Sequence, residues 1–145
     1  MGNSTPKQSE INDLTRRIIG AAIAVHRELG PGLLESLYQE AFGLELGAEK
    51  LSFEAQKAIP AYYRGVRLSG GYRIDFLVEG RVVVELKAAD RIEPVFTAQL
   101  LTYMKLTSCQ VGLLTNFNVP RLTNGIKRIV QDYDGPLPGG LIFRD

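Results

Sequence analysis

Charged residues stand among apolar ones in the segment YRIDFLVEGRVVVELK, which spans residues 72–87. Its valine, isoleucine and phenylalanine content predicts β-strand, yet Asp75, Glu85 and Lys87 belong to residue types that are rarely buried unless they are paired. Two carboxylates held on a rigid sheet can bind a metal ion. A lysine beside them can hold or deprotonate a water molecule, or stabilise charge that develops on a phosphate. The segment therefore indicates hydrolytic chemistry.

The pairing of the two strands in this segment follows from the loop that joins them. Residues 79–81 form a three-residue loop with a central glycine, a common hairpin connection that sets Val78 opposite Val82. The same register sets Asp75 opposite Glu85. A two-residue loop would mix polar and apolar side chains on each face, because a slip of one residue moves every side chain to the other face. We therefore expect the three-residue loop.

In this register the two faces of the hairpin differ in character. One face carries the apolar residues Tyr72, Ile74, Phe76, Val78, Val82, Val84, Leu86 and Ala88. The other face carries Arg73, Asp75, Leu77, Val83, Glu85 and Lys87. Opposite positions bring Cβ atoms to about 4.5–5.5 Å, where like charges destabilise a sheet unless a cation lies between them. Oxygen ligands favour Mg²⁺, followed by Mn²⁺. The alternative is a charged pair on a solvated sheet face, since an E-x-K triplet is frequent by chance.

Composition limits the kind of protein that this chain can be. It has 145 residues, 45% of them hydrophobic, and a net charge of +1. We expect a flexible tail at residues 1–9 and a single domain at residues 10–145. A charge so close to zero provides no general attraction for nucleic acid, so such a partner requires a local basic patch or metal-bridged phosphates. Cys109 is the only cysteine, which excludes an intramolecular disulfide or a zinc cluster. Because no signal peptide or membrane span is apparent, we expect a cytoplasmic protein.

Apolar periodicity predicts two helices before the first strand. The first covers residues 10–29 and ends at Gly30 and Pro31. Its core stripe is Ile11, Leu14, Ile18, Ala22, Val25 and Leu29. His26, the only histidine, lies late in this helix, where we expect a surface or capping role. The second helix is expected over residues 32–48, with a core stripe of Leu34, Leu37, Ala41 and Leu44.

Strand signals dominate the middle of the chain. A strand is expected over residues 53–63, in which Pro60 indicates an edge or a bulge. Gly65 makes a turn, after which residues 66–69 can pair back. The hairpin of residues 72–87 follows.

The last third of the chain adds one more helix and one more strand. Glu93 and Pro94 begin a helix that continues to residue 106, and residues 110–115 form a short apolar strand. Residues 122–133 fit either a helix or an edge strand, and the segment PLPGGLIFRD is expected to pack loosely. The order ααβββαβ predicts an α/β or α+β fold with a central mixed sheet flanked by helices.

Two further groups of polar residues lie at helical spacing. Gly32, Glu35 and Tyr38 share one helix face, although the helix dipole alone also favours a glutamate in a first turn. Gln99 and Tyr103 are four residues apart on the helix after the hairpin. They can lie over the polar face of the hairpin or form an ordinary pair on the helix surface.

These pieces together resemble a known group of enzymes. Asp75, followed by the Glu85-Leu86-Lys87 triplet, resembles the PD-(D/E)XK nuclease signature, and GLLESLY at residues 32–38 resembles the motif of the GxxExxY proteins in that superfamily. The resemblance covers most of residues 15–130. Two departures are Ile74, where proline can precede the aspartate, and Asn118, where we expect glycine.

The resemblance implies a restriction-endonuclease-like core with a mixed four-stranded sheet. It also implies that Asp75, Glu85 and the Leu86 carbonyl hold Mg²⁺, with Glu35 assisting from its helix. Lys87 would position or activate the attacking water.

A second element of the resemblance concerns the helix after the hairpin. Gln99 and Tyr103 resemble the Gln-x-x-x-Tyr element of RecB-like nucleases, where it supports the site. The expected function is thus a Mg²⁺-dependent nuclease that hydrolyses phosphodiester bonds, with DNA as the nucleic acid. One alternative is a non-catalytic module that binds nucleic acid or protein, since fold does not determine function. Another is a subunit of a larger DNA-processing complex, in which a second copy or a partner protein supplies missing contacts.

Overall fold

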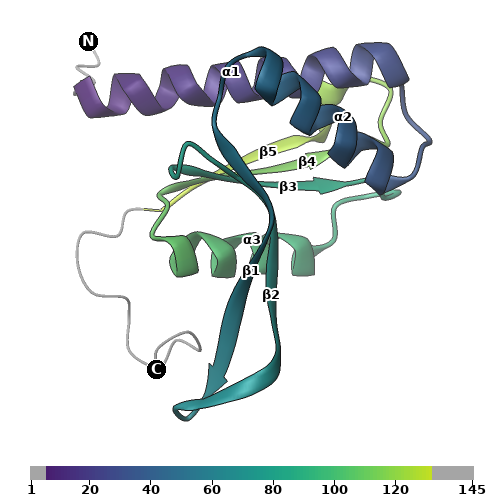
Figure 1. Cartoon of the computed structure of the whole chain (residues 1–145). Helices are drawn as coiled ribbons and strands as arrows, with labels where there is room; N and C mark the ends of the chain where they lie inside the picture. The colour runs from purple at the N-terminus through teal and green to yellow at the C-terminus, as the bar shows by residue number, and fades with distance from the viewer. Residues whose placement is uncertain (1–5, 132–145) are drawn as a thin grey trace.

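The computed structural model describes residues 6–131. Its strands are β1 (Phe53–Tyr63), β2 (Val66–Val78), β3 (Val82–Lys87), β4 (Val111–Asn116) and β5 (Ile126–Val130). Its helices are α1 (Pro6–Leu29), α2 (Glu35–Ala48), α3 (Pro94–Thr107) and the 3-10 helix η1 (Leu122–Gly125). The strands form one sheet in the order β1-β2-β3-β4-β5, in which β3 and β4 are parallel and the other neighbours antiparallel (Figure 1). The predicted α+β fold with a central mixed sheet is confirmed.

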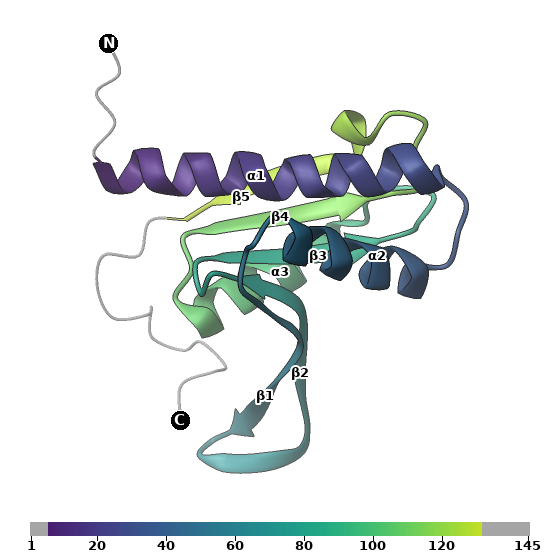
Figure 2. The ribbon, with the colours of Figure 1, turned by 45° about the horizontal axis from the view of Figure 1, so that its top comes forward.

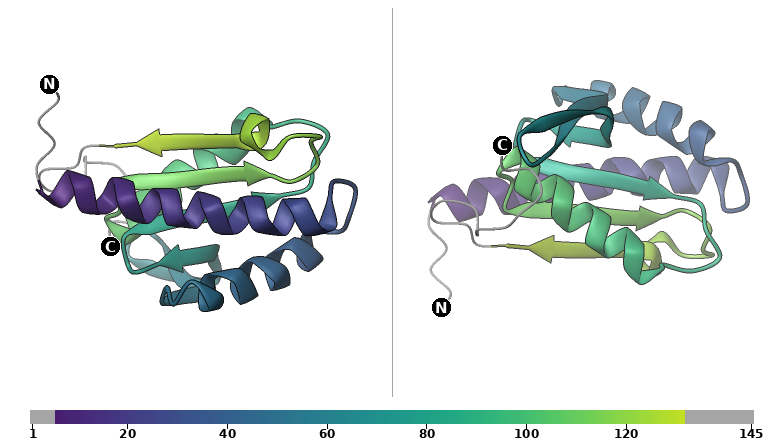
Figure 3. Two further views of the ribbon diagram at one scale, coloured as in Figure 1. Left: turned by 90° about the horizontal axis from the view of Figure 1, so that it is seen from above. Right: turned by 90° about the horizontal axis from the view of Figure 1, so that it is seen from below.

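The sheet separates two apolar layers. α1 and α2 lie on one face of the sheet, and α3 covers the other (Figures 2 and 3). The larger cluster of buried side chains joins α1 and α2 to the sheet and includes Ile18, Phe42 and Val84. The smaller cluster joins α3 to the opposite face and includes Leu100 and Val83. Val83 and Val84 contribute to different layers because successive side chains of a strand point to opposite faces.

Helix α1 is longer than its apolar periodicity predicts. It begins at Pro6, so residues 6–9 belong to the helix and not to a flexible tail. Proline fits this position because its missing N–H and restricted φ suit a first helical turn. The predicted core residues Leu14, Ile18, Ala22 and Val25 are all buried. His26 is also buried, with Nε2 2.7 Å from the carbonyl oxygen of Val119, so the expected surface role is wrong.

Helix α2 differs from its prediction in both its start and its buried face. It begins at Glu35, three residues later than expected. The predicted stripe is largely exposed, with Leu34 and Leu44 each 72% accessible and Leu37 47%. The buried residues are instead Tyr38, Phe42 and Leu46. Because apolar residues lie on two sides of this helix, spacing alone does not select the core face. The larger aromatic rings occupy it, since they bury more area.

The hairpin of β1 and β2 forms as predicted and extends further. β1 has the expected bounds, and it is an edge strand whose register shifts between Pro60 and Tyr62. At the tip, Arg64 and Gly65 have φ values of 50° and 79°. Positive φ at both central residues is the mark of the two-residue turn that matches the twist of a hairpin.

The pairing of β2 with β3 confirms the predicted register. Phe76 pairs with Val84, and Val78 pairs with Val82. The predicted division of side chains between the two faces holds for these residues. It is wrong for Tyr72 and Ile74, which were expected on the face of Phe76 but pack with the α3 cluster on the opposite face. The ladder between the strands ends at Phe76, where β2 turns away from β3. The point at which the two strands separate is called the fork below.

The structure of the C-terminal part of the described chain decides between the helix and the edge strand that the sequence left open for residues 122–133. Of residues 122–133, the first part forms η1 and the next part forms the edge strand β5, so the sheet has five strands where the resemblance implied four. The PLPGGLIFRD segment lies outside the described residues. Among the helices of the described part, none is long and apolar enough to cross a membrane.

Candidate functional site

The two carboxylates of the hairpin meet at the fork. Asp75 is 8% exposed and Glu85 is 3% exposed. The backbone N–H of Asp75 donates a hydrogen bond to Glu85 Oε2 at 2.8 Å, and the N–H of Leu86 donates one to Asp75 Oδ2 at 2.9 Å. The ladder between β2 and β3 stops at the Phe76–Val84 pair, next to the two acids. Each carboxylate therefore accepts an N–H group that lies just beyond the paired part of the strands. The reciprocal bonds stabilise the fork and fix the two acids side by side.

Burial gives these acids unusual protonation behaviour. Burial, followed by the negative charge of Asp75, raises the pKa of Glu85 to about 8. The pKa of Asp75 is also raised by burial, against the opposing effects of the Leu86 N–H group and the charge of Lys87. Two carboxyl groups this close cannot both ionise easily, so the pair favours a bound proton or a bound cation.

Lys87 provides the positive charge of the site. It lies two residues beyond Glu85 on β3 and is half-buried, with Nζ 4.6 Å from the centroid of the Phe96 ring on α3. Its charge lowers the pKa values of Glu35, Asp75 and Glu85, in each case against a larger increase caused by burial. One lysine thus acts electrostatically on all three predicted acids.

Glu35 reaches the site from the first turn of α2. Burial raises its pKa, and the charges of Lys87 and Asp75 act on it in opposite directions. Gln39, one helical turn later, donates from Nε2 to Glu35 Oε2 at 3.4 Å and is also hydrogen-bonded to Asp75. Gln39 therefore links the helix to the fork, a role that the motif spacing did not reveal. Its position four residues after Glu35 was the available signal.

The loop before α2 explains why Glu35 lies at this place. Gly32 has φ of 91°, a conformation that favours glycine. The Tyr38 hydroxyl donates to the Gly30 carbonyl at 2.5 Å and accepts from the Leu33 N–H at 3.2 Å, which holds both ends of the loop. The buried Tyr38 ring stacks on Phe117 with the centroids 4.5 Å apart. The glycine and tyrosine of the motif thus position its glutamate.

The pair on α3 lies on the other side of the two acids. Tyr103 is buried, and its hydroxyl is hydrogen-bonded to the Arg73 backbone and the Gln99 side chain. Burial raises the pKa of Tyr103, and the negative charge of Glu85 adds to this increase. Gln99 is exposed and is linked to the site through its hydrogen bond with this tyrosine.

Two further residues support the site and were not predicted from the sequence. Gln56 on β1 lies across from Asp75, is hydrogen-bonded to it, and has φ of 52° in the middle of a strand. Positive φ is uncommon for residues other than glycine, so the local structure must impose it. Asn116 braces the chain after β3, donating to the Ala89 carbonyl at 2.9 Å and accepting from the Ala89 N–H at 3.0 Å. Gln56 stands in no recognisable motif, Asn116 lies in the GLLTNFN segment at residues 112–118, which is part of the family resemblance, and only the fold brings both residues to the fork.

The donor set suits a hard divalent cation in part. Asp75 and Glu85 offer negatively charged oxygen atoms, which Mg²⁺ prefers as ligands. Because both acids are buried, the ionised pair is unfavourable unless a cation neutralises it. Within the described residues, no three histidine, cysteine or acidic side chains gather into a group that could hold a metal. The two acids at the fork therefore form a pair, and a ligand role for Glu35 or the Leu86 carbonyl stays a prediction.

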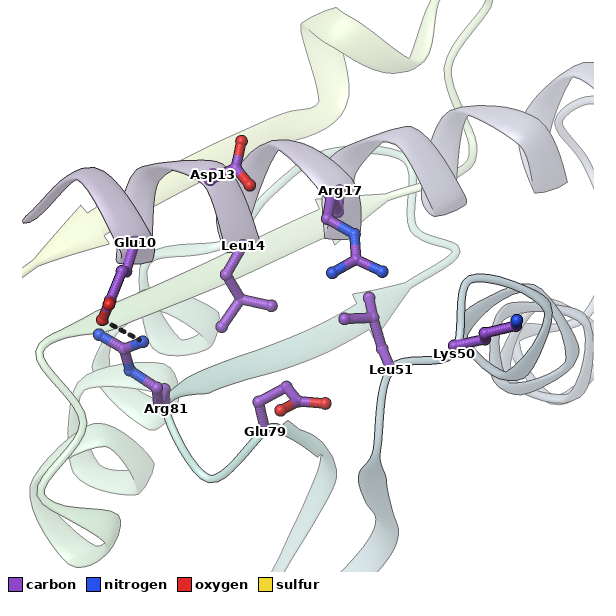
Figure 4. A pocket seen from close by; sticks show the side chains of 8 residues that line it. All are labelled: Glu10, Asp13, Leu14, Arg17, Lys50, Leu51, Glu79 and Arg81. Carbon is purple, nitrogen blue, oxygen red and sulfur yellow. Dashed lines mark ion pairs between the residues drawn. The ribbon is translucent and has the colours of Figure 1, made fainter. Parts of the chain in front are cut away.

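A pocket elsewhere on the molecule is separate from this site. It has a volume of about 350 Å³ and lies between α1 and the turn that joins β2 to β3, at the end of β3 opposite to Lys87 (Figure 4). Charged side chains of both signs line it, and Arg81 forms an ion pair of 3.7 Å with Glu10. None of the predicted catalytic residues contributes to this pocket.

Comparison with known proteins agrees with the geometry of the fork. A search of curated proteins and a search of solved structures each returned no match. The family model described as the PD-(D/E)XK nuclease superfamily matches residues 12–129, a span that runs from α1 into β5 and contains every residue of the site. With the signature acids paired at the fork and the lysine beside them, the chain belongs to the PD-(D/E)XK nuclease superfamily.

Proposed function

We propose that this protein is a Mg²⁺-dependent nuclease that hydrolyses phosphodiester bonds, with DNA as its substrate. The observation that carries the proposal is the buried Asp75–Glu85 pair with Lys87 two residues further along β3. Such a cluster of like charges is costly for a fold to maintain, and it is the arrangement that a divalent cation would stabilise. Superfamily membership supports the general reaction class.

Some residues of the site would bind the cation, and Lys87 would act on the water and the phosphate. Asp75, Glu85 and the Leu86 carbonyl would hold Mg²⁺ or Mn²⁺, with Glu35 assisting. The bound ion supplies Lewis-acid stabilisation of charge on the phosphate. Lys87 orients the attacking water and stabilises the negative charge that develops as the phosphodiester bond breaks.

The two residues on α3 act through their neighbours. Tyr103 packs beside Glu85, and Gln99 holds the Tyr103 hydroxyl. We assign both a positioning role, in which they keep the carboxylate pair oriented and restrict water behind it. This role predicts a smaller loss of activity on their replacement than on replacement of Lys87.

The test is Lys87→Ala in a cleavage assay that compares duplex, single-stranded, branched and RNA substrates with Mg²⁺, Mn²⁺ or EDTA. We expect the variant to lose metal-dependent cleavage by at least about 100-fold, the usual effect of removing a charged group from a transition state. Lys127→Ala, which removes an exposed lysine on β5, is the matched control and should retain full activity. Undiminished cleavage by Lys87→Ala would contradict the proposal.

A second candidate function is a non-catalytic binding module, which one observation favours. Each acid at the fork already accepts a backbone N–H group, so the pair has a structural use without any metal. Metal-independent DNA binding with no turnover on any of the substrates above would support this alternative. Membership of the GxxExxY group, a cytoplasmic location, and action as a homodimer or within a larger complex also remain proposals, and light scattering of the purified protein tests the dimer.

A further inference from the structure

The outer part of the β1–β2 hairpin forms an arm, defined as residues 57–73. It extends past α3 and away from the rest of the sheet (Figures 1 and 2). Residues 63–71 within it are all exposed. At about 3.3 Å per residue, the strands of the arm reach roughly 20–25 Å from its base to the turn at Arg64 and Gly65.

The arm concentrates positive charge in a protein whose net charge is close to zero. It contains Lys57, Arg64, Arg67 and Arg73 and no acidic residue, whereas the net charge of the whole chain is only +1. Lys57 at the base forms an ion pair of 2.6 Å with Glu54. Among the described residues, no acidic side chain pairs with any of the three arginines. The arm therefore presents three exposed arginines, none of which is ion-paired to an acidic side chain within residues 6–131.

The base of the arm coincides with the candidate site. β2 carries Asp75 two residues after Arg73, so a ligand held along the arm passes directly to the fork. The fork itself holds three acids, Glu35, Asp75 and Glu85, against the single charge of Lys87. Even with a proton bound to the Asp75–Glu85 pair, it has no excess positive charge to attract a phosphate backbone in the absence of a cation. The arginines supply the attraction that the site lacks, and guanidinium groups bind phosphate oxygens well.

The shape of the arm favours a duplex over a single strand. Proteins bind single strands mainly by stacking bases on open aromatic rings. Of the arm's tyrosines, Tyr62 and Tyr72 are half-buried, and the ring of Tyr72 packs edge-on against Tyr103 at 6.2 Å. Tyr63 is exposed, but the guanidinium of Arg64 lies 5.5 Å from its ring centroid. A narrow two-stranded ribbon of this kind fits the major groove of B-form DNA, whereas the major groove of an RNA duplex is too narrow.

We infer that the arm binds the phosphate backbone of duplex DNA through Arg64, Arg67 and Arg73 and holds the duplex against the fork, an inference that rests on the proposed function. Along 20–25 Å of B-DNA roughly a dozen phosphate charges are available to three arginines. Contacts of this type give affinity without sequence specificity.

The test measures binding of the full chain to a fluorescently labelled DNA duplex by anisotropy, in EDTA so that no cleavage occurs. The arm variant replaces all three arginines, as Arg64→Gln, Arg67→Gln and Arg73→Gln. At about 0.1 M salt we expect its affinity to fall on the order of 100-fold, and the slope of log affinity against log salt to shrink by about 3. A variant with lysine at the three positions should retain most of the affinity and the slope.

The matched control removes the same charge from α1, as Lys7→Gln, Arg16→Gln and Arg27→Gln, all at exposed positions. Its affinity should stay within about 3-fold of the unaltered protein. Equal losses in the arm and control variants, or no loss in either, would overturn the inference. The inference would also be overturned if the arm variant lost as much affinity for a single strand, or for an RNA duplex of the same length, as for the DNA duplex.

Failure of the arm and failure of the proposed nuclease are distinguishable. Absence of metal-dependent cleavage by the unaltered protein contradicts the nuclease and leaves the binding comparison intact. Unchanged duplex binding by the arm variant refutes the arm even where cleavage is observed. Circular dichroism should show the same fold for all variants, because every replaced side chain is exposed.

Discussion

The two halves of β2 have opposite environments within one continuous strand. Residues 74–78 are buried throughout, whereas residues 66–73 are exposed except for the half-buried Tyr72. Residues 76–78 of the inner half pair with β3 as well as with β1, and apolar clusters on both faces join this half to the helices. The outer half has β1 as its only strand neighbour. Asp75 stands where the two environments meet. A carboxylate there is buried enough for its pKa to rise, yet it lies next to the exposed half of the strand.

This contrast shows how a sheet can combine a rigid site with an extended binding element. The inner half is held by packing, and its position is set by Phe76, which contacts the Phe42 ring edge-on at 4.9 Å. The outer half is held by its ladder with β1 and by contact of Ile59 and Tyr72 with the α3 cluster. A catalytic site requires the rigid packing of the inner half. The exposed outer half is compatible with contact to a long ligand.

The largest expected difference between the halves is in stability. Phe76→Ala should lower the free energy of unfolding by about 3–5 kcal/mol, because it leaves a cavity between α2 and the sheet. Leu68→Ala, on the exposed outer half, should change it by less than about 0.5 kcal/mol. Urea denaturation followed by circular dichroism measures both. Similar values for the two variants would show that the arm is as firmly packed as the inner half.

An intermediate effect is expected at the boundary residue. Asp75→Ala leaves the buried Leu86 N–H without its acceptor and should lower the free energy of unfolding by about 1–3 kcal/mol. Asp75→Asn keeps an oxygen acceptor and removes the repulsion with Glu85, so its stability should be close to that of the unaltered protein. Both variants should lose metal-dependent cleavage. If Asp75→Asn retained cleavage, Asp75 would serve the fold alone.

The most gradual effect, spread over several units of pH, is the response of the inner half to pH. The pKa of Glu85 in the folded protein is about 8, above its ordinary value of 4.5. Between these values the folded state holds a proton that the unfolded state has lost, so the free energy of unfolding falls as pH rises. For one proton the slope is at most about 1.4 kcal/mol per pH unit.

Thermal denaturation at pH values from 5 to 8, in EDTA, measures this slope. Glu85→Gln cannot ionise and should flatten it, whereas the arm variant should leave it unchanged. Addition of Mg²⁺ to the unaltered protein at the upper end of the range should restore stability, because a cation stabilises the ionised pair. A slope that persists in Glu85→Gln would assign the titration to another group.

Much of the fold could be predicted from local patterns. The three-residue loop was enough to predict the pairing of Val78 with Val82, because side-chain alternation leaves only one register that keeps the faces distinct. The bounds of β1 and the start of α3 at Pro94 also followed from the chain, since proline restricts φ wherever it occurs and Gly65 permits the positive φ of the turn after β1. These features depend on neighbours within a few residues.

The buried face of α2 could not be chosen in the same way. Its two apolar stripes have the same period, and only contact with the sheet decided that Tyr38 and Phe42 are buried and Leu34 and Leu44 exposed. The faces of Tyr72 and Ile74 were predicted wrongly for a related reason. Alternation assumes that the two strands stay paired along their length. The pairing of β2 with β3 covers only residues 76–78, so Tyr72 and Ile74 lie on a part of β2 that has separated from β3.

The sequence by itself determined the chemistry at the centre of the molecule: two acids and a lysine at strand spacing, with a glutamate opening a helix. Only the tertiary structure decided what surrounds them. Gln39 and Gln56 reach Asp75 from elements that are distant along the chain, and the separation of β2 from β3 turns the outer hairpin into an arm. Residue types and short spacings are properties of the chain, whereas burial depends on the surfaces that other elements present, and these form only when the whole sheet assembles.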